Sequence, residues 1–323
     1  MTATIVTGAT GFLGGAVARR LLAAGEPVIA VGRNREKLAG LARLGATPLD
    51  LDLVHSPIPQ TLPPASHLVH CAALSSPWGA RSAFEAANVH GTQRAMGLAR
   101  AAGVRRFVHI SSPSVYFRFA DQERVPEDTI LPPPVNAYAA TKAASETRVL
   151  AEPSLDPIIL RPRGLYGPGD TALLPRLLRA ARQRPLPLMR DGSAATDLTY
   201  IDDVVDAVLA AMHAPSPAAR VFNISGGQAL SIRTVAEQAA AKAGIEIRWQ
   251  RLPWSAVQAV TLLNEALHAI LPGRPEPSVT AYGAGLFAFR QTLDISRARD
   301  MLGWEPRVTF EEGLERTFAE QAA

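Results

Sequence analysis

Short apolar segments alternate with amphipathic ones along the first half of the chain. Runs rich in apolar and β-branched residues predict strands, and apolar positions three or four residues apart predict helices between them. We expect strands at Thr4–Thr7, Pro27–Val31, Thr47–Leu51, His67–Cys71, Arg106–Ser111 and Pro157–Leu160. The helices are expected at Leu13–Ala24, Lys37–Leu44, Ser82–Ala102 and Ala137–Leu150. This alternation predicts an α/β fold with a doubly wound parallel sheet that is covered by helices on both faces.

The pattern becomes irregular after Arg161, where segments 162–195 and 225–290 hold many prolines and glycines. Between these segments, Asp203–Met212 predicts a helix and Val221–Ile224 predicts a strand that returns to the sheet. We therefore expect two units that interleave in sequence. A nucleotide-binding domain comprises 1–165 with 194–224, and a smaller substrate-binding lobe comprises 166–193 and 225–323.

One apolar stripe stands out in the second irregular segment. Residues Trp254–Leu271 carry apolar side chains at helical spacing, at Val257, Val260, Leu263, Leu267 and Ile270. We expect a lid or substrate-lobe helix there. Attachment to a membrane surface stays open as an alternative, although polar residues interrupt the stripe and no lysine flanks it.

Composition narrows the class of protein. Apolar residues make up 47% of the 323 residues, which is enough for a sizeable core. The net charge is +4, but the basic residues are scattered, so no nucleic-acid partner is expected. The single Cys71 excludes an internal disulfide, and the seven histidines lack metal-ligand spacing, so we predict no metal. The start lacks a secretory-signal pattern and no apolar run is long enough to span a membrane, so a cytoplasmic protein is expected.

A glycine-rich segment follows the first expected strand and opens the first helix. It places Gly8, Gly11 and Gly14 at three-residue spacing. Glycines permit a tight turn and let backbone N–H groups approach a pyrophosphate at the positive end of a helix. This position predicts the phosphate-binding loop of a Rossmann dinucleotide fold. The competing interpretation is a structural tight turn.

The end of the second strand bears on the kind of cofactor. It has no acidic residue to accept hydrogen bonds from a ribose 2′-hydroxyl, and Arg33 offers a bidentate partner for a 2′-phosphate. We therefore expect NADP(H), and NAD(H) stays open. The competing interpretation of Arg33 is a solvated loop arginine.

Tyr138 and Lys142 are four residues apart in an expected helix, so they share one helix face. An ammonium beside a phenol favours the phenolate, and we expect Lys142 to lower the pKa of Tyr138 toward neutrality. Tyr138 then becomes a general acid or base for a hydroxyl/carbonyl pair. The strand Arg106–Ser111 is followed by further hydroxyls at Ser112 and Ser114, and a serine at this strand end is expected to hold the substrate oxygen beside Tyr138. The competing interpretations are a chance pair on a solvated face and a serine that only closes the strand end.

Together these residues resemble the extended short-chain dehydrogenase/reductase superfamily, the NAD(P)-dependent epimerase/dehydratase group, over nearly the whole chain. The segments that carry the resemblance are Thr7–Gly14, Asp52-Leu53, His70–Ala73, Asn88–Thr92, Arg161–Gly169, Thr199–Asp203 and Leu293–Pro306. The resemblance implies cofactor contacts from the loop glycines, Tyr138 and Lys142. It adds contacts from Thr10, Phe12, Leu13, Asp52, Leu53, Cys71, Ala72, Ala73 and Arg161.

The resemblance also implies a mechanism, in which a hydride passes between nicotinamide C4 and a substrate carbon. Tyr138 then moves the hydroxyl proton, and Ser112 orients and polarises the oxygen. Lys142 tunes Tyr138 and holds the ribose, and Asn88 orders a water relay.

Two departures from the patterns of the group bear on the substrate. Dehydratases of the group place Thr-Asp-Glu where this chain has Ser112-Pro-Ser114, so sugar 4,6-dehydration is not expected. Nucleotide-sugar enzymes place an arginine, which meets the diphosphate, where this chain has Thr196. Arg190 and Arg163 lie near this position in the sequence, and either is expected to be able to meet a diphosphate in place of that arginine.

Other segments are more similar to the 3β-hydroxysteroid dehydrogenase-like branch, which includes reductases of 3-oxoacyl chains. These are Ser75–Gly79, Pro113 and Tyr116–Phe119. Their aromatic side chains predict an apolar pocket with few polar anchors, and ordinary packing is the competing interpretation. Substrate contacts are expected from Ser75, Trp78, Ser114, Phe117, Arg163 and Tyr166.

Three hypotheses about function follow. The first is an NAD(P)-dependent oxidoreductase that interconverts a hydroxyl and a ketone on a mainly apolar, steroid- or oxoacyl-like small molecule. The second is a nucleotide-sugar 4-epimerase or reductase. The third is an NADP-sensing regulator without turnover, although such regulators usually lose the tyrosine and lysine that this chain keeps. Members of the group often form dimers, so the resemblance also implies a homodimer.

Overall fold

A seven-stranded parallel sheet forms the centre of the larger part of the fold. The computed structural model describes residues 2–59 and 61–319. The strand order is β12-β7-β5-β4-β1-β2-β3, and every neighbouring pair is parallel. The strands are β1 Ala3–Thr7, β2 Val28–Gly32, β3 Thr47–Asp50, β4 Ala65–His70, β5 Arg106–Ile110, β7 Ile158–Pro162 and β12 Val221–Ile224. The order reverses between β1 and β4, which opens a crevice at their carboxyl ends. The expected doubly wound α/β fold is confirmed.

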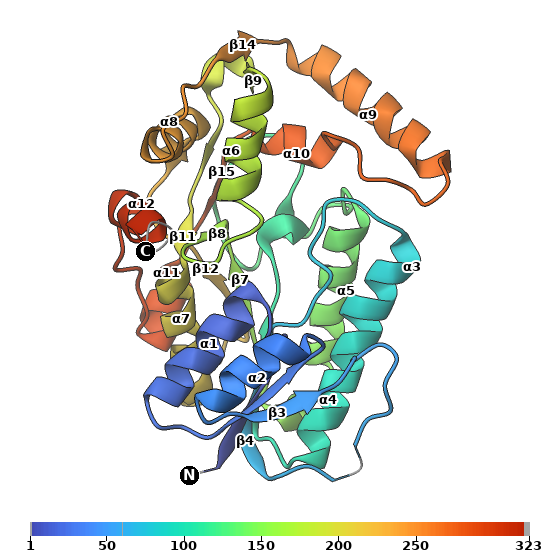
Figure 1. The fold of residues 1–323 in the computed structure, drawn as a ribbon, viewed down its shortest axis with the longest axis vertical. Helices are drawn as coiled ribbons and strands as arrows, with labels where there is room; N and C mark the ends of the chain where they lie inside the picture. The colour runs from blue at the N-terminus through green and yellow to red at the C-terminus, as the bar shows by residue number, and fades with distance from the viewer. Residues whose placement is uncertain (1, 60, 320–323) are drawn as a thin grey trace.

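Helices cover both faces of this sheet (Figure 1). One core includes α1 Phe12–Ala23, α2 Arg35–Arg43 and α7 Ile201–His213. The opposite core includes α4 Gly91–Ala101 and α5 Ala137–Leu150. Side chains alternate between the two cores along a strand: Val6 of β1 belongs to the first and Ile5 to the second. Both faces of β1 are therefore buried, which explains its unbroken apolar run.

The single helix expected at Ser82–Ala102 is divided in the structure. It consists of α3 Arg81–Phe84, the π-helical turn η1 Glu85–His90, and α4. The expectation of one regular helix is therefore wrong. A single π-helical turn is so short that it hardly changes the spacing of apolar residues, so the sequence pattern does not distinguish it from an α-helix. Such turns are frequent at functional sites, and this one carries Asn88.

The smaller part of the fold lies beyond the carboxyl ends of the sheet, in the upper half of Figure 1. Its main sheet has the order β13-β10-β15-β6 and mixes parallel and antiparallel pairs. Its strands are β6 Gln122–Val125, β10 Ala195–Thr196, β13 Leu230–Ser231 and β15 Gln291–Leu293. Two strand pairs accompany it, β8 Leu165–Tyr166 with β11 Thr199–Tyr200, and β9 Leu186–Leu188 with β14 Trp249–Arg251.

Helices in this part include two that the irregular sequence pattern did not predict, α6 Leu174–Gln183 and α8 Ile232–Lys242. The others are α9 Trp254–Ile270, α10 Ala281–Leu286, α11 Ser296–Leu302 and α12 Phe310–Ala319. Short 3₁₀ turns are η2 Pro113–Tyr116, η3 Pro153–Leu155 and η4 Arg190–Gly192. The buried face of α8 is built mainly of alanine, and small side chains make a weak hydrophobic pattern in sequence.

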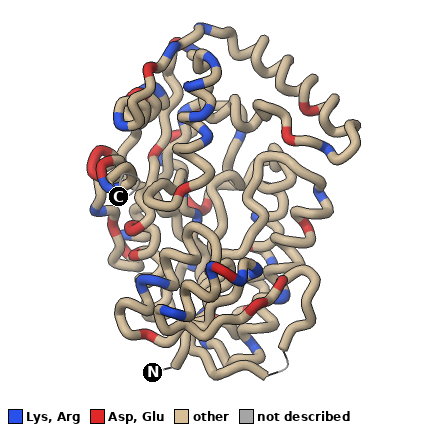
Figure 2. Tube along the Cα trace, in the orientation of Figure 1, with Lys and Arg blue, Asp and Glu red and all other residues tan. Residues whose placement is uncertain are grey.

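The apolar stripe of α9 is exposed along much of its length. Val260, Leu263 and Ile270 are exposed, and so is Leu262, which together with Glu265 lines a cavity described below. Across residues 2–59 and 61–319, no helix is long and apolar enough to cross a membrane. Figure 2 shows acidic and basic residues interspersed over both parts of the fold.

Candidate active site

The turn between β1 and α1 requires its glycines. Gly8 has a positive φ of +68°, and a Cβ there would lie 2.8 Å from the backbone nitrogen of Ala72. A Cβ at Gly14 would lie 2.3 Å from the carbonyl oxygen of Gly8. Gly11 begins α1 without a side-chain cap, so the first N–H groups of the helix stay available to an anion. This geometry fits the pyrophosphate of a dinucleotide.

The segment that follows β4 runs beside this turn. The backbone N–H of Cys71 donates to the Thr7 carbonyl at 3.2 Å, and that of Ala72 donates to the Thr7 hydroxyl at 3.4 Å. Burial raises the pKa of the Cys71 thiol to about 12, so it is a neutral thiol rather than a nucleophile. The structure therefore places Cys71 and Ala72 beside the glycine turn, and cofactor contacts of Cys71, Ala72 and Ala73 stay a prediction.

A buried hydrogen-bond chain fixes the two neighbouring strands. The Thr92 hydroxyl donates to the Asn88 carbonyl at 2.6 Å, so it accepts from Nε2 of His70 at 3.0 Å. Nδ1 of His70 then accepts from the Thr7 hydroxyl at 2.7 Å. Burial lowers the pKa of His70 to about 3, which keeps the ring neutral. The chain holds the glycine turn against the helix that carries Asn88.

Arg33 lies at the end of β2, beside the same crevice. Its side chain is 74% exposed, and Nη1 lies 3.6 Å from the carboxylate of Asp52. A hydrogen bond from the Val54 backbone lowers the pKa of Asp52, and Arg33 and His55 lower it further. Leu53, the residue after Asp52, is buried. The arginine is accessible to a phosphate, and Thr10 packs against Gly32 just before it.

Tyr138 lies in the first turn of α5. Asn136 caps this helix by accepting from the backbone N–H of Ala139 at 2.8 Å. The Tyr138 hydroxyl forms hydrogen bonds with the side chains of Ser75 and Ser112. Burial raises the pKa of Tyr138, and the two serine hydrogen bonds oppose that rise. The phenol is therefore protonated at neutral pH in this structure.

Lys142 shares the face of α5 with Tyr138 but acts on other groups. Its Nζ donates to the carbonyl of Ile110 at 2.6 Å, at the end of β5. Its charge lowers the pKa values of His70 and His109, and it is not among the groups that shift Tyr138. The expectation that Lys142 lowers the pKa of Tyr138 is therefore wrong for this structure. Burial of Lys142 itself lowers its pKa to about 8, although Glu146 opposes this shift.

The amide of Asn88 holds the loop after β4. Its Oδ1 accepts from the Leu74 backbone at 2.8 Å, and its Nδ2 donates to the Leu74 carbonyl at 3.2 Å and to the Thr141 hydroxyl at 3.0 Å. Thr141 belongs to α5, so Asn88 ties the segment that carries Ser75 to the helix of Tyr138. This geometry is that of a positioning residue.

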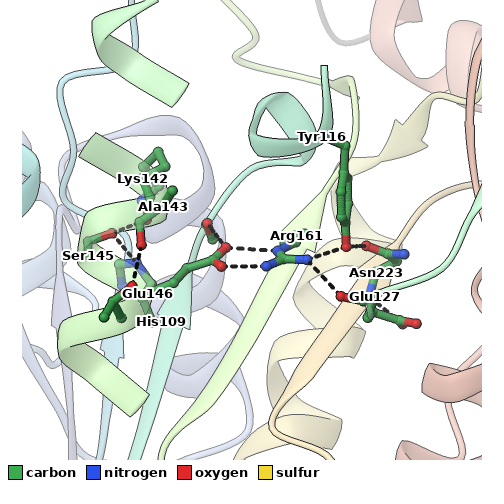
Figure 3. Close-up of polar contacts among 11 residues, drawn as sticks. His109, Tyr116, Glu127, Lys142, Ala143, Ser145, Glu146, Arg161 and Asn223 are labelled. Atoms are coloured by element: carbon green, nitrogen blue, oxygen red, sulfur yellow. Dashed lines mark hydrogen bonds and ion pairs between the residues drawn. The ribbon is translucent and has the colours of Figure 1, made fainter. Parts of the chain in front are cut away.

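Arg161 lies in a buried polar cluster behind α5 (Figure 3). Its Nε donates to Glu146 at 2.8 Å, its Nη2 donates to the other carboxylate oxygen, and its Nη1 donates to the Tyr116 hydroxyl. The Tyr116 hydroxyl donates in turn to Asn223 at 3.0 Å. Each of the three guanidinium nitrogens thus has a hydrogen-bond partner within the core. Its position corrects the expectation of a cofactor contact, because the cluster holds α5 in place instead.

Of four residues expected to contact substrate, three lie near Tyr138 or the residues of a cavity, and the fourth, Tyr166, does not. Ser75 meets Tyr138, and Trp78 lines a cavity of about 240 Å³. Phe117 packs against Tyr282 with ring centroids 4.9 Å apart. Tyr166 lies elsewhere, since its ring packs against Phe310 and Tyr200, and its hydroxyl donates to the Phe310 carbonyl at 3.4 Å. The structure therefore corrects the expectation for Tyr166, which packs beneath α12.

Two further polar residues are buried near the same region. The hydroxyl of Ser114 has no hydrogen-bond partner among the described residues. Arg163 lies against Asp197, with Nε 3.0 Å from its carboxylate, and donates to Thr196 at 3.0 Å. Both residues were expected to contact substrate.

The cavity is lined by segments far apart in sequence. Its aromatic and apolar walls come from Trp78, Phe84, Phe119, Leu262 and Tyr282. Glu265 adds a carboxylate, which accepts from the backbone N–H of Ala281 at 2.8 Å. Ala137, the residue before Tyr138, also lines it. Sequence reasoning missed Phe84, Glu265 and Tyr282 as site residues, and the one available signal was the polar Glu265 within the apolar stripe.

Comparisons with known proteins agree with this geometry. The model of the NAD dependent epimerase/dehydratase family matches residues 4–225. The chain is 34% identical to a 2-alkyl-3-oxoalkanoate reductase of Stenotrophomonas maltophilia, over 99% of each protein. It is 29% identical to a mouse (Mus musculus) sterol-4-alpha-carboxylate 3-dehydrogenase, decarboxylating, over 78% of this chain and 73% of that protein.

A solved structure shares the fold. UDP-glucuronic acid 4-epimerase from Bacillus cereus, in complex with NAD, superposes with a TM-score of 0.76 at 23% identity and covers 98% of this chain and 97% of that one. At this identity the likeness concerns the fold. The match to the family model and the crevice residues together show that the chain is an NAD(P)-dependent dehydrogenase/reductase that belongs to the NAD dependent epimerase/dehydratase family.

Proposed function

We propose that this protein uses NADP(H) to interconvert a hydroxyl and a ketone on a mainly apolar substrate, steroid- or oxoacyl-like. The observation that carries the proposal is the hydrogen bond between the hydroxyls of Tyr138 and Ser112, beside an aromatic cavity. Two relatives with related names support it, because one is named for a 3-oxoalkanoate and the other for a sterol.

The chain's own residues divide the chemistry between them. A bound nicotinamide supplies or accepts the hydride. Ser112 orients the substrate oxygen by a hydrogen bond, as it now orients the Tyr138 hydroxyl. Tyr138, protonated at neutral pH, donates its proton to that oxygen as the carbonyl is reduced and takes it back in the oxidation. Lys142 holds the end of β5, from which Ser112 follows.

The preference for NADP(H) rests on Arg33. Its guanidinium is exposed at the end of β2, where no acidic side chain of β2 opposes a 2′-phosphate. Asp52 lies 3.6 Å away and competes for this charge. A phosphate with two negative charges competes well with the single carboxylate of Asp52, which is 24% exposed.

A nucleotide-sugar substrate fits less well. The two arginines expected as substitutes for the missing diphosphate anchor each lie against an aspartate. Arg190 binds Asp121 in a bidentate ion pair at 2.6 and 2.7 Å, and Arg163 lies against Asp197. Thr196 itself carries no charge. The described cavity instead offers aromatic walls.

Replacement of Tyr138 by phenylalanine tests the proposal. The wild-type enzyme is first assayed with NADPH on 3-oxoacyl chains, 3-ketosteroids and, as the alternative, UDP- and GDP-sugars. On the best apolar substrate, Tyr138→Phe is expected to lower kcat by about 10²- to 10⁴-fold, because general acid–base catalysis contributes that much. Binding of NADPH should stay within about twofold, since only the hydroxyl is removed. Full turnover by the variant, or activity on sugar nucleotides alone, would refute the proposal.

A further inference from the structure

The outward face of α9 is apolar along the whole helix. At about 100° per residue, ten side chains of α9 share one half of its circumference, and all ten are exposed. They are Ser255, Ala256, Ala259, Val260, Leu262, Leu263, Ala266, Leu267, Ala269 and Ile270. Ser255 is the one polar member of this set, and none of the ten carries a charge. Three of the largest, Val260, Leu263 and Ile270, are 67%, 64% and 79% exposed.

The polar side chains of α9 lie on its inner face instead. The carboxylate of Glu265 accepts from the backbone N–H of Ala281 at 2.8 Å, and Thr261 is 5% exposed. Nδ1 of His268 donates to the Pro275 carbonyl at 2.9 Å. This side of the helix packs on α10, at the edge of the molecule (Figure 1). A helix on the surface of a globular protein has the opposite polarity, so the outer face of α9 is suited to burial against another apolar surface.

The width of the outer face favours one kind of apolar surface over another. A helix of a second copy covers a narrow seam, made by every third and fourth residue. Here that seam runs through Val260, Leu263 and Leu267. It leaves Leu262 and Ala269, at the side of the face, in water. A lipid bilayer surrounds the whole apolar half of a helix that lies in its surface, so the lipid fits this face better.

Arginines flank the outer face at both ends. Arg251 ends β14, three residues before α9 begins, and Arg274 follows the end of α9 by four residues. Both residues are exposed, and neither guanidinium has an ion pair or hydrogen bond with any residue in 2–59 and 61–319. Figure 2 shows a single acidic residue on α9, and this is the inward Glu265. The charge at this edge therefore complements the phosphates of anionic lipids.

We propose that α9 lies in the surface of an anionic lipid bilayer, with its apolar face among the acyl chains and Arg251 and Arg274 at the headgroup phosphates. The helix has 17 residues and is about 25 Å long, so it is too short to cross the bilayer and lies in its plane. Leu262 is 51% exposed and also lines the cavity, which places a wall of the cavity at the lipid surface. The membrane site goes beyond the proposed function and does not depend on it.

Flotation with lipid vesicles tests the charge requirement. The vesicles consist of phosphatidylcholine with about one third phosphatidylglycerol, and vesicles of phosphatidylcholine alone are the uncharged comparison. The wild-type protein should bind the anionic vesicles at least about tenfold more tightly, because each arginine near such a surface contributes about fivefold. Arg251→Gln/Arg274→Gln should remove this preference. Raising NaCl from about 0.1 M to about 1 M should also weaken binding, because the Debye length falls from about 10 Å to about 3 Å.

Replacement of the apolar face tests the helix itself. Leu263→Gln/Leu267→Gln/Ile270→Gln is expected to lower the partition coefficient by at least about 100-fold, since burial of each large apolar side chain contributes at least about tenfold. The three side chains are exposed, so Tm and the affinity for NADPH should stay unchanged. Leu44→Gln is the matched control and should bind vesicles like the wild type. Leu44 is 57% exposed at the end of α2, in the larger part of the fold.

A second copy of the chain is the competing occupant of the outer face. Sedimentation of the wild-type protein and of the triple variant without vesicles measures whether the face joins two copies. Three results overturn the inference: no flotation of the wild type or equal flotation with both kinds of vesicle, undiminished flotation of the triple variant, and a wild-type dimer that the triple substitution dissociates. None of these measurements uses a substrate, so they decide the membrane site even if the proposed reaction fails.

Discussion

The buried ion pair between Arg161 and Glu146 makes a quantitative prediction. Both side chains are 5% exposed, and two guanidinium nitrogens meet the two carboxylate oxygens. In Arg161→Met, Glu146 keeps the Ser111 hydroxyl as its only side-chain donor among residues 2–59 and 61–319. Breaking a buried pair by removing one partner costs about 3–5 kcal/mol of the free energy of unfolding, because the remaining charge is buried without compensation.

The expected shift in melting temperature follows from chain length. An unfolding entropy of about 2.1 cal/mol/K per residue gives about 0.7 kcal/mol/K for 323 residues. The loss of about 3–5 kcal/mol then lowers Tm by about 4–7 °C. Denaturant unfolding followed by circular dichroism measures the free energy, and a thermal scan measures Tm.

The double variant Arg161→Met/Glu146→Leu serves as the control. Removing both charges leaves no uncompensated ion, so the double variant should be more stable than the sum of the single changes predicts, by at least about 2 kcal/mol. The KM for NADPH should change little in Arg161→Met, because the arginine holds α5 rather than the cofactor. Additive single effects, a loss under about 1 kcal/mol, or a large rise in the KM for NADPH alone would refute this reasoning.

Three further predictions follow from the crevice. Arg33→Ala should raise the KM for NADPH about tenfold or more and leave that for NADH nearly unchanged, because only NADPH carries the 2′-phosphate; equal changes in both would contradict the assignment. Burial in the folded protein lowers the pKa of Lys142 from 10.5 to about 8. Between these pH values the unfolded chain therefore binds more protons than the folded one. The free energy of unfolding should rise with pH across this window, by up to about 1.4 kcal/mol per pH unit. Unfolding measured from pH 7.5 upward should show this rise relative to Lys142→Met, and parallel curves for the two proteins would argue against it. Gly14→Ala places a Cβ 2.3 Å from the Gly8 carbonyl and should cost about 1–3 kcal/mol of stability and weaken cofactor binding. Gly97→Ala in α4, where a Cβ meets nothing within 4 Å, should instead stabilise by about 0.5–1 kcal/mol, and similar effects of the two changes would count against the crowded turn.

The sequence alone predicted those features that depend on residues close to one another along the chain. The alternation of strands and helices predicted the doubly wound sheet. Crossover connections between parallel strands are right-handed, and they place helices on both faces of the sheet. The glycine turn could be predicted because its need for a positive φ at Gly8 is local. The shared face of Tyr138 and Lys142 followed from the helical repeat.

Tertiary structure decided which groups these side chains meet. Lys142 binds the carbonyl of Ile110, and Tyr138 meets Ser75, a residue brought in by the loop after β4. A periodic pattern shows a shared face, but the direction of a long side chain and the pKa of a phenol depend on burial and on partners from distant segments. Arg161 illustrates the same point, since its motif suggested the cofactor while packing placed its charge against Glu146. Tyr282 lies in a short helix without a strong pattern, and only the fold places it on the wall of the cavity that Ala137 of α5 also lines.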